Sequence, residues 1–143
     1  MGLELPAPPS SLAAYVPALR WEKTVYISGQ LPLLDGTLMC TGRLGAEVDE
    51  DQGIKAARRC TLNALAVLKA EIGDLAHVVQ VLKLTVFVAS DQAFSKQPTV
   101  ANGASELLEE VFEVRGRHAR SAVGVASLPL GASVELELIV AVD

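Results

Sequence analysis

Hydrophobic residues recur at intervals of three and four in two stretches of the chain, and this period predicts two amphipathic helices. The first begins after Asp49, which has Gln52 three residues later as in a capping box, and ends before Gly73, a residue suited to a left-handed cap. The second runs from about Pro98 to Phe112. The predicted inner stripes are Ile54, Ala57, Thr61, Leu65, Leu68 and Ile72 in the first helix, and Val100, Ala104, Leu107, Leu108 and Val111 in the second.

Other stretches alternate in polarity or are rich in β-branched residues, which predicts strands. Residues 18–21 and 24–28 read as a hairpin that turns at Glu22 and Lys23. Residues 78–88 read as a long central strand covered on both sides, in which Leu82, Leu84, Val86 and Val88 alternate with Val81, Lys83, Thr85 and Phe87. The last quarter of the chain reads as two strands that pair around a tight turn at Pro129 and Gly131.

The order strands, helix, strand, helix, strands predicts a single α+β domain with two helices packed on one face of a mixed sheet. The opposite face of that sheet is then apolar and needs a partner. With 143 residues the chain is long enough to bury one core without a metal or a disulfide. Residues 1–12, which include three prolines, are expected to form an extended lead-in.

Composition narrows the classes of function. Half of the residues are hydrophobic and a fifth are charged, an apolar surplus that indicates an oligomer interface. The net charge of −5 argues against nucleic-acid binding. The two cysteines and two histidines do not have metal-ligand spacing, so neither a metal nor another cofactor is expected. No membrane-spanning run or signal segment is visible, and we expect a cytoplasmic protein.

Charged side chains in strand-like sequence are the main candidates for chemistry. Arg120 opens the first of the two terminal strands, and Glu135 and Glu137 point to the same side of the second. A solvated outer face would explain these residue types. The same face, however, continues with Ile139 and Ala141, as expected of a surface that another chain covers.

These residues also carry a resemblance. Arg120-Ser121, Leu128-Pro129 and the run from Val134 to Glu137 resemble the C-terminal signature of the Rid (YjgF/YER057c/UK114) family, and the run from Ser28 to Pro32 resembles its second motif. The best-known members are enamine/imine deaminases with a chorismate-mutase-like fold, which assemble as homotrimers with clefts between subunits. The runs 102–105 and 116–124 are more similar to a divergent branch of the family.

The resemblance assigns roles residue by residue. Arg120 matches the arginine that binds a substrate carboxylate, and Glu135 matches a glutamate associated with water. Ala122 stands where many of the deaminases have a cysteine, and Ala13-Ala14 replaces the glycine-proline that often precedes the cleft tyrosine. Arg117 and His118 either line the entrance or belong to a solvated turn. The implied cleft residues are Tyr15, Ser28, Gly29 and Asn102.

If the terminal strands paired as a hairpin, Glu135 would lie opposite Val125, about 16 Å from Arg120. We therefore expect a site between subunits, with Arg120 from one chain and Glu135 from its neighbour. The first hypothesis is hydrolysis of small 2-imino acids to 2-keto acids and ammonia. The alternative is a non-catalytic protein that binds small carboxylates or metabolites. An endoribonuclease, the third hypothesis, would need a contiguous basic surface.

Overall fold

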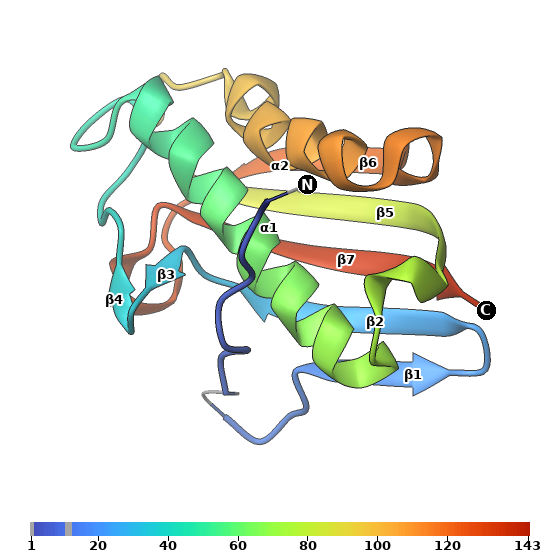
Figure 1. The fold of residues 1–143 in the computed structure, drawn as a ribbon. Helices are drawn as coiled ribbons and strands as arrows, with labels where there is room; N and C mark the ends of the chain where they lie inside the picture. Colours follow the sequence, from blue (N-terminus) through green and yellow to red (C-terminus); the bar gives the residue numbers. More distant parts are fainter. Residues whose placement is uncertain (1, 11–12) are drawn as a thin grey trace.

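Two helices cover one face of a five-stranded mixed sheet (Figure 1). The computed structural model describes residues 2–10 and 13–143. The helices are α1 (Glu50–Ile72) and α2 (Gln97–Phe112), close to the predicted ranges. The sheet has the order β1-β2-β7-β5-β6. The predicted α+β architecture is confirmed.

The strands of this sheet are β1 (Ala18–Trp21), β2 (Thr24–Gln30), β5 (Val78–Ala89), β6 (Ala119–Val125) and β7 (Val134–Val142). Two short strands, β3 (Leu33–Leu34) and β4 (Thr37–Leu38), pair beside it. As predicted, β1 and β2 form an antiparallel hairpin.

The helix termini follow the predicted capping chemistry. The backbone N–H of Gln52 donates to Asp49 Oδ1 at 2.8 Å, and the N–H of Asp49 donates to Gln52 Oε1 at 3.0 Å. Gly73 ends α1 with a φ of 86°, a conformation that glycine adopts at little cost. Local sequence thus determines where this helix begins and ends.

The terminal strands do not form the predicted hairpin. β5 lies between them: β6 pairs with it in parallel and β7 pairs with it antiparallel. The connection through α2 returns the chain to the same end of the sheet, which favours a parallel neighbour for β5. The turn at Pro129–Gly131 is present, but it carries the chain across the end of β5. Alternate residues of β7, Leu136, Leu138 and Val140, are buried under the helices, which favours a place between two strands.

β5 departs from the predicted alternation at its start. Register shifts between Val78 and Gln80 and between Val81 and Lys83 change which side chains face the helices. Leu82, predicted on the same side as Leu84, is therefore 41% exposed, whereas Val81 is buried. The expectation that both faces of this strand are covered was also wrong for the chain by itself, since the face away from the helices is open.

The open face of the sheet, the one that no helix covers, is apolar at several positions. Trp21 is 70% exposed although it lies in a strand. Further exposed apolar side chains on this face are Leu19 and Tyr26 near Trp21, and Val123 on the opposite edge strand. Exposed apolar side chains gathered as on β1 and β2 can mark an interaction site.

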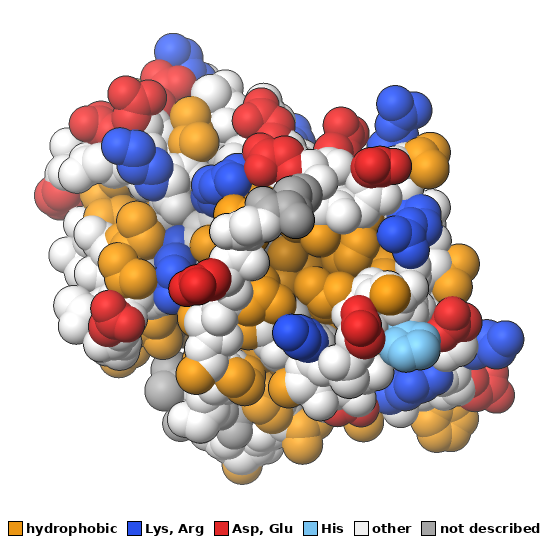
Figure 2. Space-filling view, in the orientation of Figure 1, with side chains coloured by type: hydrophobic (Ala, Val, Ile, Leu, Met, Phe, Trp, Pro, Cys, Tyr) orange, Lys and Arg blue, Asp and Glu red, His pale blue; other side chains and the backbone are white. Residues whose placement is uncertain are grey.

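The helix side carries a hollow of its own, about 510 Å³ in volume, between α1 and α2. Figure 2 shows hydrophobic side chains on its floor. Residues 2–10 form no regular element, and Leu5 packs against the core beside this hollow. Residues 1, 11 and 12 of the predicted lead-in lie outside the described residues. No helix in the described ranges is both long and apolar enough to cross a bilayer.

Candidate functional site

The Arg120 side chain is held against α2 at one edge of the sheet. Its register partner on β5 is Leu84, which is buried under the helices, so Arg120 points to the helix side. Arg120 Nη1 donates to Asn102 Oδ1 at 2.8 Å and to Ser105 Oγ at 3.1 Å. Nη2 makes a longer contact, 3.4 Å, with the carbonyl of Pro98. The Pro98 contact takes one of the two hydrogens of Nη2, and no partner of Nε is found among the described residues, so the Nε–Nη2 edge of the planar fork can still bind a carboxylate.

His118 joins the same group. Its Nε2 lies 2.9 Å from Ser105 Oγ, and its Nδ1 lies 2.6 Å from the carbonyl oxygen of Gly116. The structure thus brings together two of the predicted cleft residues, Asn102 and His118, with Arg120. We call Asn102, Ser105, His118 and Arg120 the arginine half-site.

Ser105 was missed as a site residue, although it ends the run that carries the resemblance. Because it follows Asn102 by three residues, the two side chains share a face of α2, and this spacing was the available signal. The structure does not bring Arg117 into this half-site. Arg117 is exposed on the segment before β6, and its backbone carbonyl accepts a hydrogen bond from Gln80.

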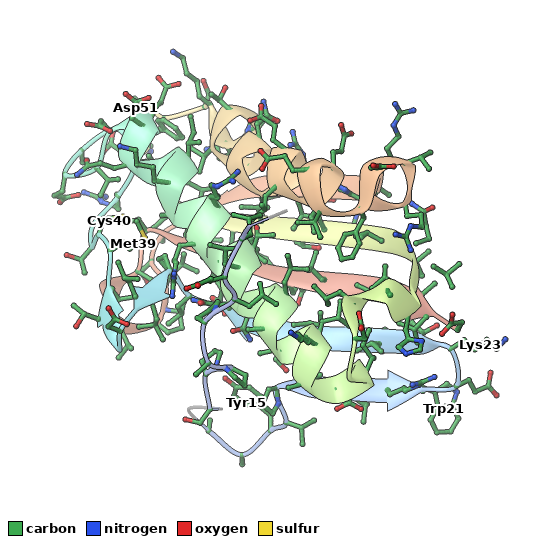
Figure 3. All side chains as sticks on the ribbon, in the orientation of Figure 1. Tyr15, Trp21, Lys23, Met39, Cys40 and Asp51 are labelled. Carbon is green, nitrogen blue, oxygen red and sulfur yellow. The ribbon has the colours of Figure 1, made fainter. Side chains whose placement is uncertain are left out.

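A second group surrounds Glu135 on β7. Gly29 lies so close that a Cβ added to it would stand 2.1 Å from Glu135 Oε1. Ser28 Oγ donates to the carbonyl of Val16 at 2.7 Å and so ties the segment that carries Tyr15 to β2. Figure 3 shows Tyr15 beside the start of β1. We call Tyr15, Ser28, Gly29 and Glu135 the glutamate half-site.

Side chains of α1 fix the backbone that follows Gly29. Asn63 Nδ2 donates to the carbonyl of Leu31 at 2.9 Å, and Arg59 Nε donates to the carbonyl of Leu33 at 2.7 Å. Both donors approach from the helix side. The loop therefore holds its shape through buried or half-buried hydrogen bonds, which positions the glutamate half-site.

The open face has a hollow of about 450 Å³ next to the glutamate half-site, lined by Tyr15, Ser28 and Glu137 among others. Burial raises the pKa of Glu135 above its ordinary value of 4.5, and the charge of Glu137 raises it further. A carboxyl of this kind holds a proton closer to neutral pH, as proton transfer requires.

Neither cysteine belongs to the two half-sites. Cys60 is fully buried in α1, and burial raises the pKa of its thiol well above the ordinary value. Cys40 is half-buried in the segment after β4 (Figure 3). Among the described residues, no three His, Cys, Asp or Glu side chains gather as a metal site would need.

The two half-sites lie on opposite faces of the sheet. Arg120 is level with Leu84 of β5, and Glu135 is level with Phe87. The two positions are about 10 Å apart along the strands and about 10 Å across them. One small ligand cannot reach both within a single chain.

Comparison with known proteins agrees with this fold. The sequence pattern described as "YjgF/chorismate_mutase-like, putative endoribonuclease" matches residues 1–141. The chain belongs to this family, the YjgF or Rid family. The sequence predicted a branch of the family apart from the best-studied imine deaminases, and the identities of its relatives confirm this.

One similar protein is TCP17 of Trypanosoma cruzi, 45% identical over 98% of this chain and 88% of that protein. The crystal structure of Atu1372, a protein of unknown function from Agrobacterium tumefaciens, is also 45% identical and has a TM-score of 0.94, over 99% of this chain and 87% of that one. The 2-iminobutanoate/2-iminopropanoate deaminase of Dermatophagoides farinae is 30% identical, over 99% of this chain and 95% of that enzyme. The named deaminase is thus a more distant relative than TCP17 and Atu1372.

Proposed function

We propose that this Rid protein is a hydrolase that converts small 2-imino acids to 2-keto acids and ammonia in clefts between subunits of a homotrimer. The arginine half-site of one subunit faces the glutamate half-site of its neighbour. The observation that carries the proposal is the position of the two half-sites on opposite faces of one sheet. The exposed apolar residues of the open face supply a surface on which another subunit can pack.

Arg120 anchors the substrate carboxylate in this mechanism. Its Nη1 is already bonded to Asn102 and Ser105, so Nε and Nη2 donate side by side to the two carboxylate oxygens. The fork is largely immobile before the ligand arrives, so binding costs little side-chain entropy.

Glu135 of the neighbouring subunit moves the protons. Water adds to C2 of the imine, and its oxygen loses a proton to the Glu135 carboxylate. The carboxyl then passes this proton to the nitrogen, which gives the 2-amino-2-hydroxy acid. Glu135 next carries the hydroxyl proton to the amino nitrogen, and the C–N bond breaks to leave the keto acid and ammonia. The raised pKa of Glu135 suits a group that both takes and gives a proton.

Ammonia release from freshly generated 2-iminobutanoate tests the reaction. We expect Arg120→Lys, which keeps the charge but loses the fork, to lower turnover or affinity about tenfold to a hundredfold. Lys55→Gln, on the exposed face of α1, is the control and should leave ammonia release unchanged. Wild-type protein that does not accelerate ammonia release would contradict the proposal.

Mixed assemblies test the sharing of the site between subunits. Arg120→Ala and Glu135→Gln chains should each be inactive alone. When both chains assemble together at random, roughly a quarter of the clefts combine an intact arginine half-site with an intact glutamate half-site, so activity returns in that proportion. No recovery in verified mixed trimers would show that the site is not shared in this way.

A non-catalytic carboxylate-binding protein is the second candidate function. The observation that favours it is that hydrogen bonds to Asn102 and Ser105 fix the Arg120 guanidinium. A fixed guanidinium can bind a carboxylate whether or not a reaction follows. Binding of 2-oxobutanoate without any ammonia release from the imine would establish this alternative.

A further inference from the structure

When the His118 ring is neutral, the hydrogen bonds of the arginine half-site have only one chemically possible direction. Arginine can only donate, so Ser105 Oγ accepts from Arg120 Nη1. A carbonyl can only accept, so the proton on the His118 ring sits on Nδ1 and is donated to Gly116. In the neutral imidazole Nε2 is then an acceptor, and it takes the hydroxyl proton of Ser105. The chain of donors runs from Arg120 through Ser105 and His118 to Gly116.

This direction determines what Ser105 can do. Its single proton is committed to His118, so a lone pair of Oγ stays aimed at Arg120. Asn102 Oδ1 accepts the other hydrogen of Nη1. Two acceptors on one face of α2 thus fix both the position and the plane of the guanidinium.

We propose that Ser105 and His118 are positioning residues that aim the Nε–Nη2 edge of Arg120 at a planar carboxylate and keep Nη1 out of ligand binding. This inference rests on the proposed function only in taking the ligand to be a small carboxylate. A side-on fork needs two acceptors. A carboxamide offers one acceptor and one donor group, so the half-site discriminates between an acid and its amide.

The same hydrogen bonds also connect α2 to β6, so Ser105 could serve stability alone. The two roles predict different effects of removing its hydroxyl. If Ser105 only stabilised the fold, its loss would lower resistance to urea and affect acid and amide ligands alike. If it aims Arg120, its loss weakens the acid selectively. Loss of Ser105 should also have no further effect on pyruvate affinity in a variant that already lacks the Arg120 guanidinium.

The experiment measures affinities for pyruvate and pyruvamide by calorimetry. We expect Ser105→Ala and His118→Ala to weaken pyruvate binding about tenfold and to change pyruvamide binding less than twofold. His118→Gln, whose amide oxygen replaces the Nε2 acceptor, should stay within about threefold of wild type. In an Arg120→Lys background, Ser105→Ala should cause no further loss.

Histidine tautomers seen by nitrogen NMR give an independent readout in the free protein. We expect His118 to carry its proton on Nδ1 and to lose this preference in Ser105→Ala. A proton on Nε2 in the neutral ring would overturn the inference. Urea unfolding of each variant shows whether a loss of affinity results from a loss of folded protein. If Ser105→Ala does not fold, the affinities of His118→Ala provide the test.

The outcomes separate this inference from the proposed function. Wild-type protein that binds pyruvate but releases no ammonia from imino acids overturns the proposed reaction alone. Ser105→Ala and His118→Ala proteins that bind pyruvate within twofold of wild type overturn the inference alone. Wild-type protein that does not bind pyruvate overturns both.

Discussion

Gly29 lies against the carboxylate of Glu135, closely enough that a Cβ at residue 29 would stand 2.1 Å from Oε1. Gly29 lies in the bulge of β2 between Ile27 and Gln30, on the strand that pairs with β7, which carries Glu135. The close approach of a side chain, rather than an unusual backbone conformation, thus leaves no room for a Cβ while Glu135 keeps this position.

Gly29→Ala should displace the end of the Glu135 side chain. Because the displaced atoms belong to a flexible side chain, the cost in unfolding free energy should be below about 1 kcal/mol, whereas ammonia release should fall at least tenfold. Urea unfolding and ammonia release measure the two effects. In a Glu135→Ala background, which removes the carboxylate that a Cβ at residue 29 would meet, the same substitution should cost no unfolding free energy, and an equal cost in both backgrounds would show that Gly29 acts elsewhere.

Glu135 makes the stability of the protein depend on pH. Its pKa is higher in the folded protein than its ordinary value of 4.5, so the folded state holds the proton more tightly than the unfolded state. The stability that this proton contributes is lost as pH rises from about 4 toward neutral. Glu135→Gln should therefore gain stability over wild type across this range, which urea unfolding at several pH values measures.

Removal of the neighbouring charge is the control for this pH dependence. Glu137→Gln should reduce the rise in the Glu135 pKa but not abolish it, because burial is the larger cause. The difference in unfolding free energy between Glu135→Gln and wild type should widen as pH rises. A difference that does not change with pH would contradict a raised pKa of Glu135.

Gly103 lies where α2 crosses α1. A Cβ at this position would stand 2.2 Å from the backbone carbonyl oxygen of Ile54, which cannot rotate away. Gly103→Ala should lower the unfolding free energy by about 1–3 kcal/mol despite the better helix propensity of alanine. Gly53→Ala in α1 is the matched control, because its nearest atom is the end of the Leu44 side chain. An equal or larger loss at Gly53 would show that the crossing of the backbones is not the cause.

The open face of the sheet should be an assembly surface. Val123→Glu and Trp21→Lys place charges on exposed apolar positions of this face, and burial of unpaired charge against another subunit should dissociate the proposed trimer. Light scattering after size-exclusion chromatography measures the mass. Lys55→Glu on the outer side of α1 should leave the mass unchanged. Variants of the open face that keep the mass of wild type would exclude this face from the interface.

The sequence by itself determined the helices and the first hairpin. The positions of Asp49, Gln52 and Gly73, with the apolar period between them, act within a few residues of one another, so the limits of α1 could be predicted. The resemblance predicted that Arg120 and Asn102 line one cleft, and the structure brings their side chains into contact; their roles in that cleft stay a prediction.

Only the tertiary structure decided how the terminal strands pair and which side chains share a site. The place of β5 between β6 and β7 depends on packing between segments far apart in the chain, and the exposure of Leu82 depends on a bulge that has no local signal. Ser105 on α2 is hydrogen-bonded to His118, just before β6, and to Arg120 in β6. These bonds join residues that are 13 and 15 positions apart in the sequence. Local periodicity specifies elements, but register and site geometry arise from contacts between them, which no short stretch of sequence contains.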